Sequence, residues 1–522
     1  MDEFILAIDL DTSGPKVALV SPQGNVLDCE IGETDLIILP GGGAEQDPEQ
    51  WWQAIKETTR KLLEKGAVST EKIVALGCTA QWSGTVAVDG NGRPLMNAII
   101  WMDSRGAPYV HQITNGPAKI EGYEVGKLIP WLRLTGGIPV RSGKDPIAHI
   151  LFIKHQLPHI YQQTYKFLEP KDYLNLKLTG KFAASFDSIT LHWLTDNRDI
   201  HNIHYNDQLI KLSTIDSEKL PDLKQAVDIL GPLTPEAAQE LGLPAGIPVV
   251  MGTPDIQSAA LGSGALHDFQ PHLYVGTSSW LTCHVPYKKT DIFHNMASLP
   301  SAIPGKYFIA NEQETAGACL SYLRDNILYP DDALARETRI PNVYPVFDQM
   351  VEQVPAGSEQ VIFTPWLHGE RTPVEDHLVR GGFHNLSLTA TRSHLIRAVF
   401  EGVAYNSRWL LGYVEKFIKQ PLNDIHMIGG GANSNVWCQI HADVLNRRIK
   451  QVQDPVEANA RGVALLAAVA LGLASFDTIG DDVTIAHTYE PNPANRQIYD
   501  RLFAEYLNIY KQNKGIYARL NS

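Results

Sequence analysis

The chain has 522 residues, of which 44% are hydrophobic and 20% charged, and its formal net charge is −14. A chain of this size holds two or more domains, and its acidic balance without a basic stripe excludes DNA, RNA and anionic membrane as expected partners. The five cysteines are scattered, and the first residues carry acid where a signal peptide carries positive charge. We therefore expect a cytoplasmic protein with reduced thiols and no membrane segment.

The first half of the chain alternates strand and helix signals. Residues 4–9 and 16–21 predict a β-hairpin, and residues 26–31 predict a third strand. Residues 47–66 predict a helix, because an acidic cap, a proline in the first turn and a terminal glycine mark its two ends. Residues 73–79 predict a buried strand. This order of elements indicates α/β layering.

A second series of similar signals begins after Gly246. The strand in "IPVVMGTPD" precedes a helix of small residues, and "HLYVGTSSWLTCHV" predicts another hairpin. Farther along, we expect helices over residues 391–417 and 457–473, and an amphipathic helix in "NRQIYDRLFAEYLNIYKQ" near the end. The stretch "IHMIGGGANSNVWCQIHADVL" predicts a strand, a glycine turn and a helix.

The two predicted hairpins can be aligned on each other. Thr12 matches Thr277, and Asp11 falls opposite Gly276. Similar hairpins near the start of each half favour a duplicated domain, although a short match of this kind also arises by chance. Glycine permits positive φ and a close approach of the backbone to phosphate, so an aspartate in its place is unexpected.

The turn of the first hairpin combines features that suit an anion with features that repel one. The hydroxyls of Thr12 and Ser13 and the free backbone N–H groups of a tight turn can donate to a phosphate. Asp9 and Asp11 place negative charge beside them.

The glycine turn at residues 429–431 follows an apolar strand and is expected to open a helix. That arrangement aims backbone N–H groups and the positive end of a helix dipole at an anion, while a plain tight turn is the alternative. The chain has neither a Walker loop nor a dinucleotide-binding fingerprint.

Asp255 follows "VVMGTP" at the end of an apolar strand, directly before a predicted helix. A carboxylate there is well placed to project into a cleft and accept a proton from a hydroxyl. The alternative is a simple helix cap.

The stretch from "CTAQWSG" to "IIWMDSR" is rich in groups that recognise sugars. Sugar sites pair an aromatic face with amide, carboxylate and guanidinium groups, because apolar C–H faces alternate with hydroxyls along a sugar. The candidates here are Gln81, Trp82, Ser83, Trp101, Asp103 and Arg105. In the alternative interpretation, Trp101 is a core residue and Asp103 with Arg105 is a surface pair of little energetic weight.

Several motifs in fixed order resemble one known family. "GGGAEQDPEQWW", "IIWMDSR", "EPKDYLNLKLTG", "GLPAGIPVVMGTPD", "WLHGERTP", "RAVFEGVAYNSR" and "IHMIGGGANSNVWCQIHADVL" together resemble the FGGY family of carbohydrate kinases nearly end to end, and xylulokinases most in appearance. The resemblance implies an actin-like (ribonuclease H-like) α/β fold with two related domains flanking a cleft, over residues 1–262 and 263–522. It implies transfer of a phosphoryl group from Mg-ATP to a sugar hydroxyl, and a homodimer is a further expectation.

The resemblance also carries expected roles onto residues of this chain. Asp255 falls where the family has its catalytic base, and Asp9 where an aspartate holds Mg²⁺ through water. The nucleotide is expected at Thr12, Ser13, Gly276, Thr277, Gly317, Gly430, Gly431 and Asn435. The sugar is expected at Gln81, Trp82, Ser83, Asp103 and Asp255.

The chain departs from the family pattern at the phosphate and sugar positions. Asp11 stands where most relatives have glycine, Ile256 where many have an amide, and Trp82-Ser83 where xylulokinases have Met-His. D-xylulose is the first choice of substrate, and another pentulose, a polyol or a sugar acid are the alternatives. Two other classes of protein stay open: a catalytically weakened nucleotide-binding or regulatory member, and an ATP-driven machine of the actin or chaperone type.

Overall fold

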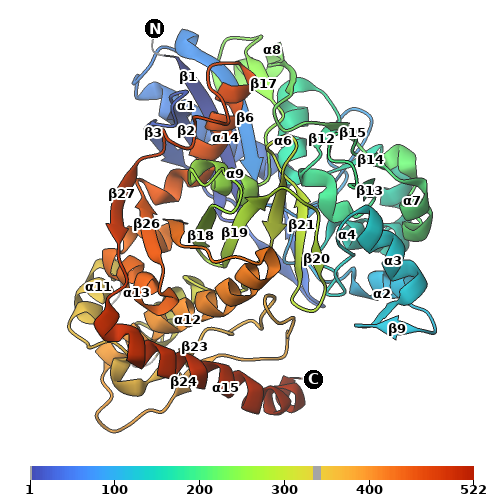
Figure 1. The fold of residues 1–522 in the computed structure, drawn as a ribbon. Coiled ribbons are helices and arrows are strands. Elements are labelled where there is room, and N and C mark those ends of the chain that lie inside the picture. Colours follow the sequence, from blue (N-terminus) through green and yellow to red (C-terminus); the bar gives the residue numbers. More distant parts are fainter. Residues whose placement is uncertain (1–2, 333–341, 522) are drawn as a thin grey trace.

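Two large mixed sheets organise the chain (Figure 1), and the computed structural model describes residues 3–332 and 342–521. The first sheet has the strand order β16-β17-β6-β1-β2-β3. Its strands are β1 (Phe4–Asp11), β2 (Gly14–Val20), β3 (Val26–Ile31), β6 (Ile73–Ala80), β16 (Ile229–Pro232) and β17 (Pro248–Val250). The predicted hairpin, its third strand and the buried strand are therefore confirmed.

The second sheet has the strand order β20-β21-β22-β19-β18-β25-β26-β27. Its strands are β18 (Pro271–Val275), β19 (Ser279–Val285), β20 (Thr290–Asp291), β21 (Met296–Pro300), β22 (Tyr307–Ala310), β25 (Asp424–Ile428), β26 (Arg448–Val452) and β27 (Ile485–Tyr489). The predicted second hairpin is the pair β18 and β19, which confirms that expectation as well.

Six strands of each sheet follow the same plan. In the first sheet β3, β2 and β1 are antiparallel neighbours, β6 and β17 continue parallel to β1, and β16 closes the edge antiparallel. In the second sheet β22, β19, β18, β25, β26 and β27 repeat these directions one by one. The two halves of the chain therefore carry related sheets. The limits of the two domains, at residues 262 and 263, stay a prediction.

Helix α1 (Pro48–Glu64) begins and ends where its sequence signals predict. The Asp47 side chain accepts a hydrogen bond from the Glu49 N–H at 2.9 Å, and Gly66 lies just past the end with φ 67°. Trp51 and Ile55 are fully buried on its inner face, in one core cluster with residues of β1, β2 and β6. Burial of this apolar stripe, more than helix propensity, fixes the helix on the sheet.

Two helices cross between the sheets. α9 (Asp255–Gly262) follows β17 of the first sheet but packs with Phe308 and Val452 of the second, whereas α14 (Ala458–Ala470) follows β26 but packs on Ile5 and Val250 of the first. Figure 1 shows the two helices beside each other. Each half of the chain therefore supplies a helix to the core of the other.

The contact between α9 and α14 is close enough to need glycine on both sides. A Cβ added to Gly262 would lie 1.7 Å from the Ala458 carbonyl oxygen, and one added to Gly462 would lie 1.8 Å from that of Ser258. The contact is reciprocal, since the same two positions of each helix meet. The two backbones touch here, so neither glycine has room for a side chain.

The remaining helices cover the second sheet or form a lobe beside the first. α12 (Arg392–Ile418), α13 (Asn435–Leu445) and α15 (Arg496–Asn521) share the core of the second sheet, and they confirm three predicted helices. The helices α2, α3, α4 and α7 form the lobe on the right of Figure 1. The other helices are α2 (Ala107–Thr114), α3 (Val125–Leu134), α4 (Pro146–Gln156), α5 (Pro158–Gln163), α6 (Pro170–Thr179), α7 (Asp207–Ser213), α8 (Pro235–Leu241), α10 (Ala318–Leu323) and α11 (Tyr344–Glu352).

Short strands pair outside the two large sheets. They are β4 (Ile37–Leu39), β5 (Gly43–Gln46), β7 (Val86–Val88), β8 (Ala98–Ile99), β9 (Lys119–Ile120), β10 (Tyr123–Glu124), β11 (Lys166–Leu168), β12 (Ala183–Ser185), β13 (Thr195–Asp196), β14 (His204–Tyr205), β15 (Asp222–Lys224), β23 (Ile362–Thr364) and β24 (Gly382–His384). Within residues 3–332 and 342–521, no helix has both the length and the apolar character needed to span a membrane.

Candidate active site at the carboxyl ends of the parallel strands

The parallel strands of each sheet end at the place where ligands of α/β proteins are usually bound. At the end of the first sheet, Asp11 closes β1, Gln81 follows β6 and Asp255 follows β17, and the Gln81 N–H donates to the Leu10 carbonyl at 2.8 Å. At the end of the second sheet, Gly276 follows β18, and residues 429 and 455 follow β25 and β26. We call the region where these two sheet ends meet the junction.

The junction holds a buried charged pair that the sequence prediction did not include. The Lys16 Nζ lies 3.3 Å from Asp9 Oδ2 and 3.9 Å from Asp11 Oδ2, and it donates to the Val456 carbonyl at 3.0 Å. Asp9 is fully buried and pairs with Lys16 across the hairpin. Lys16 therefore offsets part of the negative charge of the first turn and ties the turn to the second half of the chain. The Lys in "GPKV" is the signal that could have revealed it.

The carboxyls of the first turn resist ionisation. Burial raises the pKa of Asp9, against the opposing attraction of Lys16. Asp11 has 41% of its side chain exposed, yet the low-polarity surroundings and then the charge of Asp9 raise its pKa to about 7. Two acids share one lysine, so adding further negative charge here is unfavourable without a cation.

Asp255 is the first residue of α9, and Pro254 is the cap of that helix, so the interpretation of Asp255 as a helix cap is wrong. Its Oδ1 accepts a hydrogen bond from the Ile256 N–H at 2.8 Å. Burial raises its pKa well above the ordinary value, and the charges of Asp11, Asp9 and Glu312 raise it further. A carboxylate with a raised pKa is a better proton acceptor than an ordinary one.

The second turn is shaped by the absence of side chains. The Gly317 N–H donates to the Gly276 carbonyl at 2.7 Å, and a Cβ at Gly317 would lie 2.5 Å from that oxygen. A Cβ at Gly276 would lie 2.3 Å from the Tyr274 hydroxyl. Neither Gly276 nor Asp11 has a positive φ; in the first turn that conformation belongs to Gly14, with φ 143°. Gly276 is therefore not needed for a positive φ, which corrects that part of the expectation, and the close approach of this backbone to phosphate stays a prediction.

The glycine turn after β25 does not itself open the α-helix. Residues Gly430–Asn433 form a 3-10 turn, and α13 begins at Asn435 with Ser434 as its cap, which accepts from the Trp437 N–H at 3.1 Å. Gly430 is exposed with open space around it, whereas a Cβ at Gly431 would lie 2.6 Å from Val275. The prediction of a helix starting at the glycines is therefore corrected by a few residues.

Gln81 and Trp82 use their polar groups inside the protein. The Gln81 amide donates to Gln46 at 2.7 Å and accepts from the Thr12 hydroxyl at 3.1 Å, which connects the sugar-side segment to the first turn. The Trp82 indole N–H donates to the Ser188 carbonyl at 2.9 Å. Its ring packs against the apolar cluster that contains Ile256. Trp82 therefore offers an apolar surface.

Ser83 lies in a constrained segment. It has φ 65°, and its hydroxyl donates to the Lys144 carbonyl at 2.8 Å. The next residue, Gly84, donates its N–H at 3.0 Å to Glu169, a buried acid that sequence analysis missed. A non-glycine residue in the left-handed region is uncommon, and such strain often lies at functional sites.

Asp103 is a buried anchor of the sugar-side segment. It is 1% exposed, and its carboxylate accepts from the Ala44 N–H at 2.9 Å and from the Arg105 side chain at 2.8 Å. Arg105 also pairs with Glu45 at 2.6 Å. The interpretation of Asp103 and Arg105 as a weak surface pair is therefore wrong. Trp101 is only partly buried, and its indole N–H donates to the Thr12 hydroxyl at 3.0 Å.

A cluster of four charges links the two halves beside Ser83. Lys144 Nζ lies 3.3 Å from Glu314 Oε1, and Arg371 reaches the same oxygen at 2.9 Å and also pairs with Glu312. Lys144, Glu314, Arg371 and Glu312 form what we call the ionic bridge. Arg371 lies within the quoted motif "WLHGERTP", but the two glutamates gave no signal by themselves.

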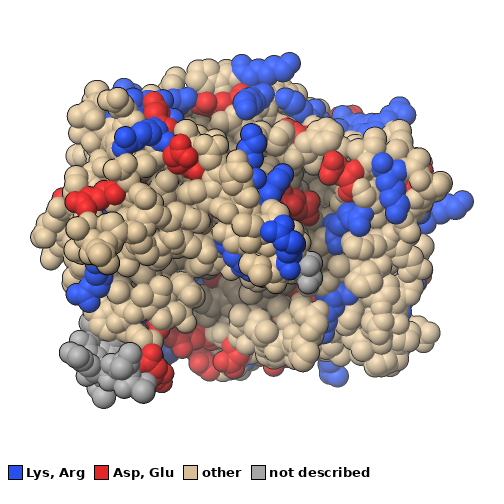
Figure 2. Space-filling view, turned by 90° about the horizontal axis from the view of Figure 1, so that it is seen from below, with Lys and Arg blue, Asp and Glu red and all other residues tan. Residues whose placement is uncertain are grey.

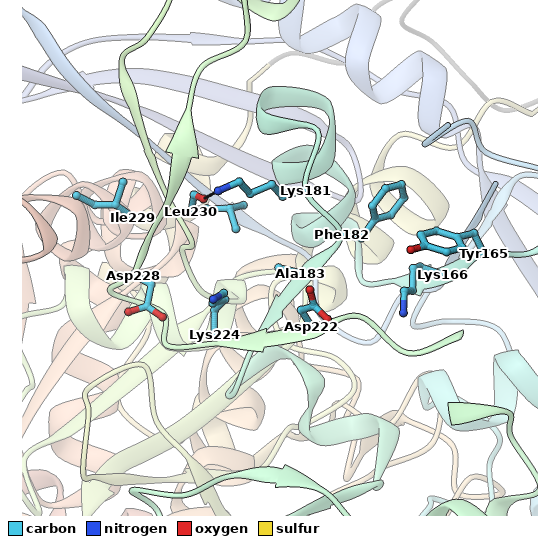
Figure 3. A pocket seen from close by; sticks show the side chains of 10 residues that line it. All are labelled: Tyr165, Lys166, Lys181, Phe182, Ala183, Asp222, Lys224, Asp228, Ile229 and Leu230. Atoms are coloured by element: carbon cyan, nitrogen blue, oxygen red, sulfur yellow. Dashed lines mark hydrogen bonds between the residues drawn. The ribbon is translucent and has the colours of Figure 1, made fainter. Parts of the chain in front are cut away.

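A separate hollow of about 720 Å³ lies away from the junction (Figure 3). Two of the lysines that line it bind backbone carbonyls: Lys181 donates to the Leu230 carbonyl at 2.5 Å, and Lys166 donates to the carbonyls of Glu218 and Leu220. No residue that sequence analysis proposed for a site lines it. The junction therefore stays the candidate active site.

Charged side chains of both signs are mixed on the face of the molecule that Figure 2 shows. Figure 2 shows Lys and Arg spread over one face with Asp and Glu between them, with no continuous basic stripe on that face.

Among the described residues, no group of three or more His, Cys, Asp or Glu side chains has the arrangement of a metal cluster. An ion held mainly by ligand oxygens and water would need no such cluster.

Comparison with known proteins identifies the chain. The N-terminal domain of the FGGY family of carbohydrate kinases matches residues 4–262, and the C-terminal domain of the same family matches residues 273–471. The chain belongs to the FGGY family of carbohydrate kinases. Its activity is the ATP-dependent phosphorylation of a sugar, and its two related sheets are those of the actin-like ATPase fold.

Relatives of this FGGY kinase carry two different substrate names. The xylulose kinase of Staphylococcus epidermidis is 29% identical, covering 99% of the chain and 98% of the relative, and the gluconokinase of Bacillus subtilis is 25% identical, covering 100% and 98%. The structure of a gluconate kinase from Lactobacillus acidophilus superimposes with a TM-score of 0.85 at 23% identity, covering all of both chains. The family is shown, but these names leave the sugar open.

Proposed function

We propose that this FGGY kinase phosphorylates a hydroxyl of a ketopentose, with D-xylulose as the first choice. The observation that carries the proposal is the position of Asp255, which begins α9 at the junction with a raised pKa and lies within the electrostatic reach of the first turn. The similarity to xylulose kinases over the full length supports the choice of sugar.

In this proposal Asp255 accepts the proton of the sugar hydroxyl whose oxygen attacks the terminal phosphorus of ATP. The bond from that phosphorus to the bridging oxygen breaks, and ADP leaves. General bases of this kind contribute about 10²–10⁴ in rate. Thr12, Ser13 and Thr277 offer hydroxyls to the phosphates, and the glycine turns allow the nucleotide to approach the backbone. Phosphoryl transfer depends mainly on such positioning and on neutralised charge. Trp82 would cover an apolar face of the sugar, beside Ser83 and Asp103.

The residues of the first turn fit a magnesium ion. Asp9 Oδ1 is buried and accepts no hydrogen bond from the protein, although the nearby Asn459 side chain lowers the pKa of Asp9. This carboxylate oxygen could therefore accept a hydrogen bond from a water of the ion. Bound Mg²⁺ would neutralise phosphate charge. Asp9 would hold the water shell of the ion, and Lys16 orients the Asp9 carboxyl and favours its ionised form against the effect of burial.

A second candidate function follows from two residues. Asp11 puts a second acid beside the phosphates, and Ile256 puts a hydrocarbon side chain next to the base. Both changes favour a catalytically weakened member of the family that binds nucleotide and signals its presence. Such a protein would gain thermal stability with Mg-ATP but would release no ADP in response to any sugar.

The test is a panel of ketoses, polyols and sugar acids incubated with Mg-ATP. The proposal expects ADP release that depends on D-xylulose, with a phosphorylated pentulose identified by mass spectrometry. Release with a polyol or sugar acid in place of every ketose contradicts the choice of sugar. Thermal stabilisation by Mg-ATP with no turnover across the panel supports the second candidate instead.

A further inference from the structure

We infer that Glu312 makes this site selective for uncharged sugars over sugar acids, by occupying the arginine that would otherwise receive a substrate carboxylate. This inference rests on the proposed function. Relatives of the chain are named for a neutral sugar, xylulose, and for a sugar acid, gluconate, and the inference favours the neutral class as substrate. It rests on four residues of the ionic bridge and on the acids of the junction, and it assigns Glu312 a role in specificity.

The two cations of the ionic bridge are already paired. Arg371 holds Glu312 with one terminal nitrogen and reaches Glu314 with the other at 2.9 Å, and its Nε also donates to Glu314 at 3.1 Å. Lys144 lies 3.3 Å from Glu314. Glu314 is only 2% exposed, so it is a fixed part of the protein, whereas Glu312 is 25% exposed. Glu312 is thus the carboxylate of the bridge that faces solvent.

Glu312 also belongs electrically to the junction. Its charge acts on Asp255 and on Tyr274, as do the charges of Asp9 and Asp11. A ligand beside the base therefore meets four acids, while Lys16 is committed to Asp9. A sugar carboxylate brought there would be repelled, and the paired guanidinium of Arg371 would have no free fork to receive it.

Neutral sugars meet no such obstacle. Carboxylates accept hydrogen bonds from hydroxyls, so Glu312 can bind a ketose or polyol without giving up Arg371. Bidentate pairing of a guanidinium with a carboxylate is among the stronger polar contacts of proteins, so freeing Arg371 should open the site to acids. Replacement of Glu312 by glutamine removes one negative charge at nearly constant volume and releases one terminal nitrogen of Arg371, while Nε and the other terminal nitrogen stay on Glu314.

The experiment compares sugars that differ only at one end. Xylitol is paired with D-xylonate and D-glucitol with D-gluconate, since each pair exchanges a CH₂OH group for a carboxylate, and D-xylulose is added as the proposed substrate. Affinities are measured by calorimetry at pH 7.5 without ATP, for the native protein and for Glu312→Gln. The control is Glu490→Gln, which removes an exposed partner of Arg448 outside the junction.

We expect the native protein to bind at least one polyol about 10-fold or more tightly than its matched acid. Glu312→Gln should shrink that ratio about 5-fold or more, and Glu490→Gln should leave it unchanged. Raising the salt concentration should also shrink the ratio in the native protein, because the repulsion acts across solvent. A merely structural role of Glu312 would weaken both members of a pair alike and leave the ratio as it was.

Three outcomes overturn the inference: equal or tighter binding of the acids by the native protein, an unchanged ratio in Glu312→Gln, or no binding by any member of the pairs. Failure of the proposed function looks different. Neutral sugars would then bind with the expected preference, but no ADP would form when Mg-ATP is added, and the specificity of the site would stand.

Discussion

The two hairpin turns occupy equivalent places in related sheets, yet they are built from opposite chemistry. In the first, Asp9 faces Lys16 across the strands as an ion pair. In the second, the cross-strand pair is Tyr274 and Trp280, whose rings stack with centroids 3.9 Å apart. The first hairpin thus carries a charged pair, whereas the second carries a neutral pair of stacked aromatic rings.

The two crossing helices show the same division. The reciprocal contact equates Ser258 with Ala458 and Gly262 with Gly462, so the position of Asp255 corresponds to Pro455. The first helix carries a candidate base, and the second carries no acid at that place. The close helix contact is repeated in both halves, whereas the proposed chemistry needs the base and the charged pair of Asp9 and Lys16 only once.

The largest expected effect comes from removing the candidate base. Asp255→Asn should lower kcat about 10²–10⁴-fold without changing the thermal midpoint by more than a few degrees, because the amide fills the same space but cannot accept the proton. The control is Asp228→Asn, in which an acid outside the junction that accepts from the Gln225 N–H is changed in the same way. Steady-state ADP release measures both. If the turnover of Asp255→Asn stays within a few-fold of that of the native protein, Asp255 is not the catalytic base, and its presence at the start of α9 but not at the corresponding position before α14 does not matter for catalysis.

The link between the two halves should control stability in acid. Although burial opposes it, the charges of Arg371 and Lys144 lower the pKa of Glu314 to about 2. A carboxyl group whose pKa is lowered in the folded state stabilises the fold at pH values above its ordinary pKa of 4.5. This contribution is lost as the pH falls toward 2. Glu314→Gln should therefore cost on the order of 3 kcal/mol near neutral pH and progressively less below pH 4.5.

Urea unfolding at pH 7, 4 and 3 checks the sign of this pH dependence. Glu490→Gln serves as the matched control, because its exposed pair should contribute less than about 1 kcal/mol at any pH. A difference between Glu314→Gln and the native protein that stays constant from pH 7 to pH 3 would contradict the role assigned to the buried bridge.

Local signals were enough to predict most elements, but not the contacts between them. The hairpins, α1 and α12 have turn residues, caps and apolar periodicity within a short window, and the structure confirms them. The start of α13 was misplaced because glycines suggest a turn, while the capping hydroxyl of Ser434 decides where the helix begins. Family resemblance, not periodicity, identified the fold.

The candidate site divides in the same way. Asp255 was found from its place after an apolar strand, and Asp9 from its place in a turn. The partners that tune them were not found: Lys16 contacts Val456, and Lys144 contacts Glu314, across separations of 440 and 170 residues. A window on the sequence cannot see such pairs, and burial reversed the interpretation of Asp103 as a surface acid.

Because α9 and α14 touch at their backbones, replacing glycine by alanine should have opposite effects on stability at Gly462 and at Gly412. Gly462→Ala should destabilise the protein by about 1–3 kcal/mol and lower kcat, because its Cβ would meet the Ser258 carbonyl and push α9 with Asp255 out of place. Gly412→Ala, in α12 with nothing within 4 Å of the new Cβ, should stabilise by up to about 1 kcal/mol. Thermal midpoints measure both, and shifts of the same sign would show that the two helices do not touch as described.

The smallest expected effect, a few-fold in affinity, tests why the first turn tolerates a second acid. Asp11→Gly should tighten Mg-ATP binding by removing a charge beside the phosphates. Asp11→Asn should do the same, because the position has no positive φ and glycine brings no conformational advantage. With the pKa of Asp11 raised to about 7, the carboxyl is largely protonated at pH 6 and ionised at pH 8. The gain in both variants should therefore be larger at pH 8 than at pH 6, as titration with Mg-ATP at the two values measures. Tighter Mg-ATP binding by Asp11→Gly but not by Asp11→Asn would show that the backbone, and not the charge, weakens binding in the native protein. An equal gain in affinity at both pH values would show that the charge of Asp11 does not oppose the nucleotide.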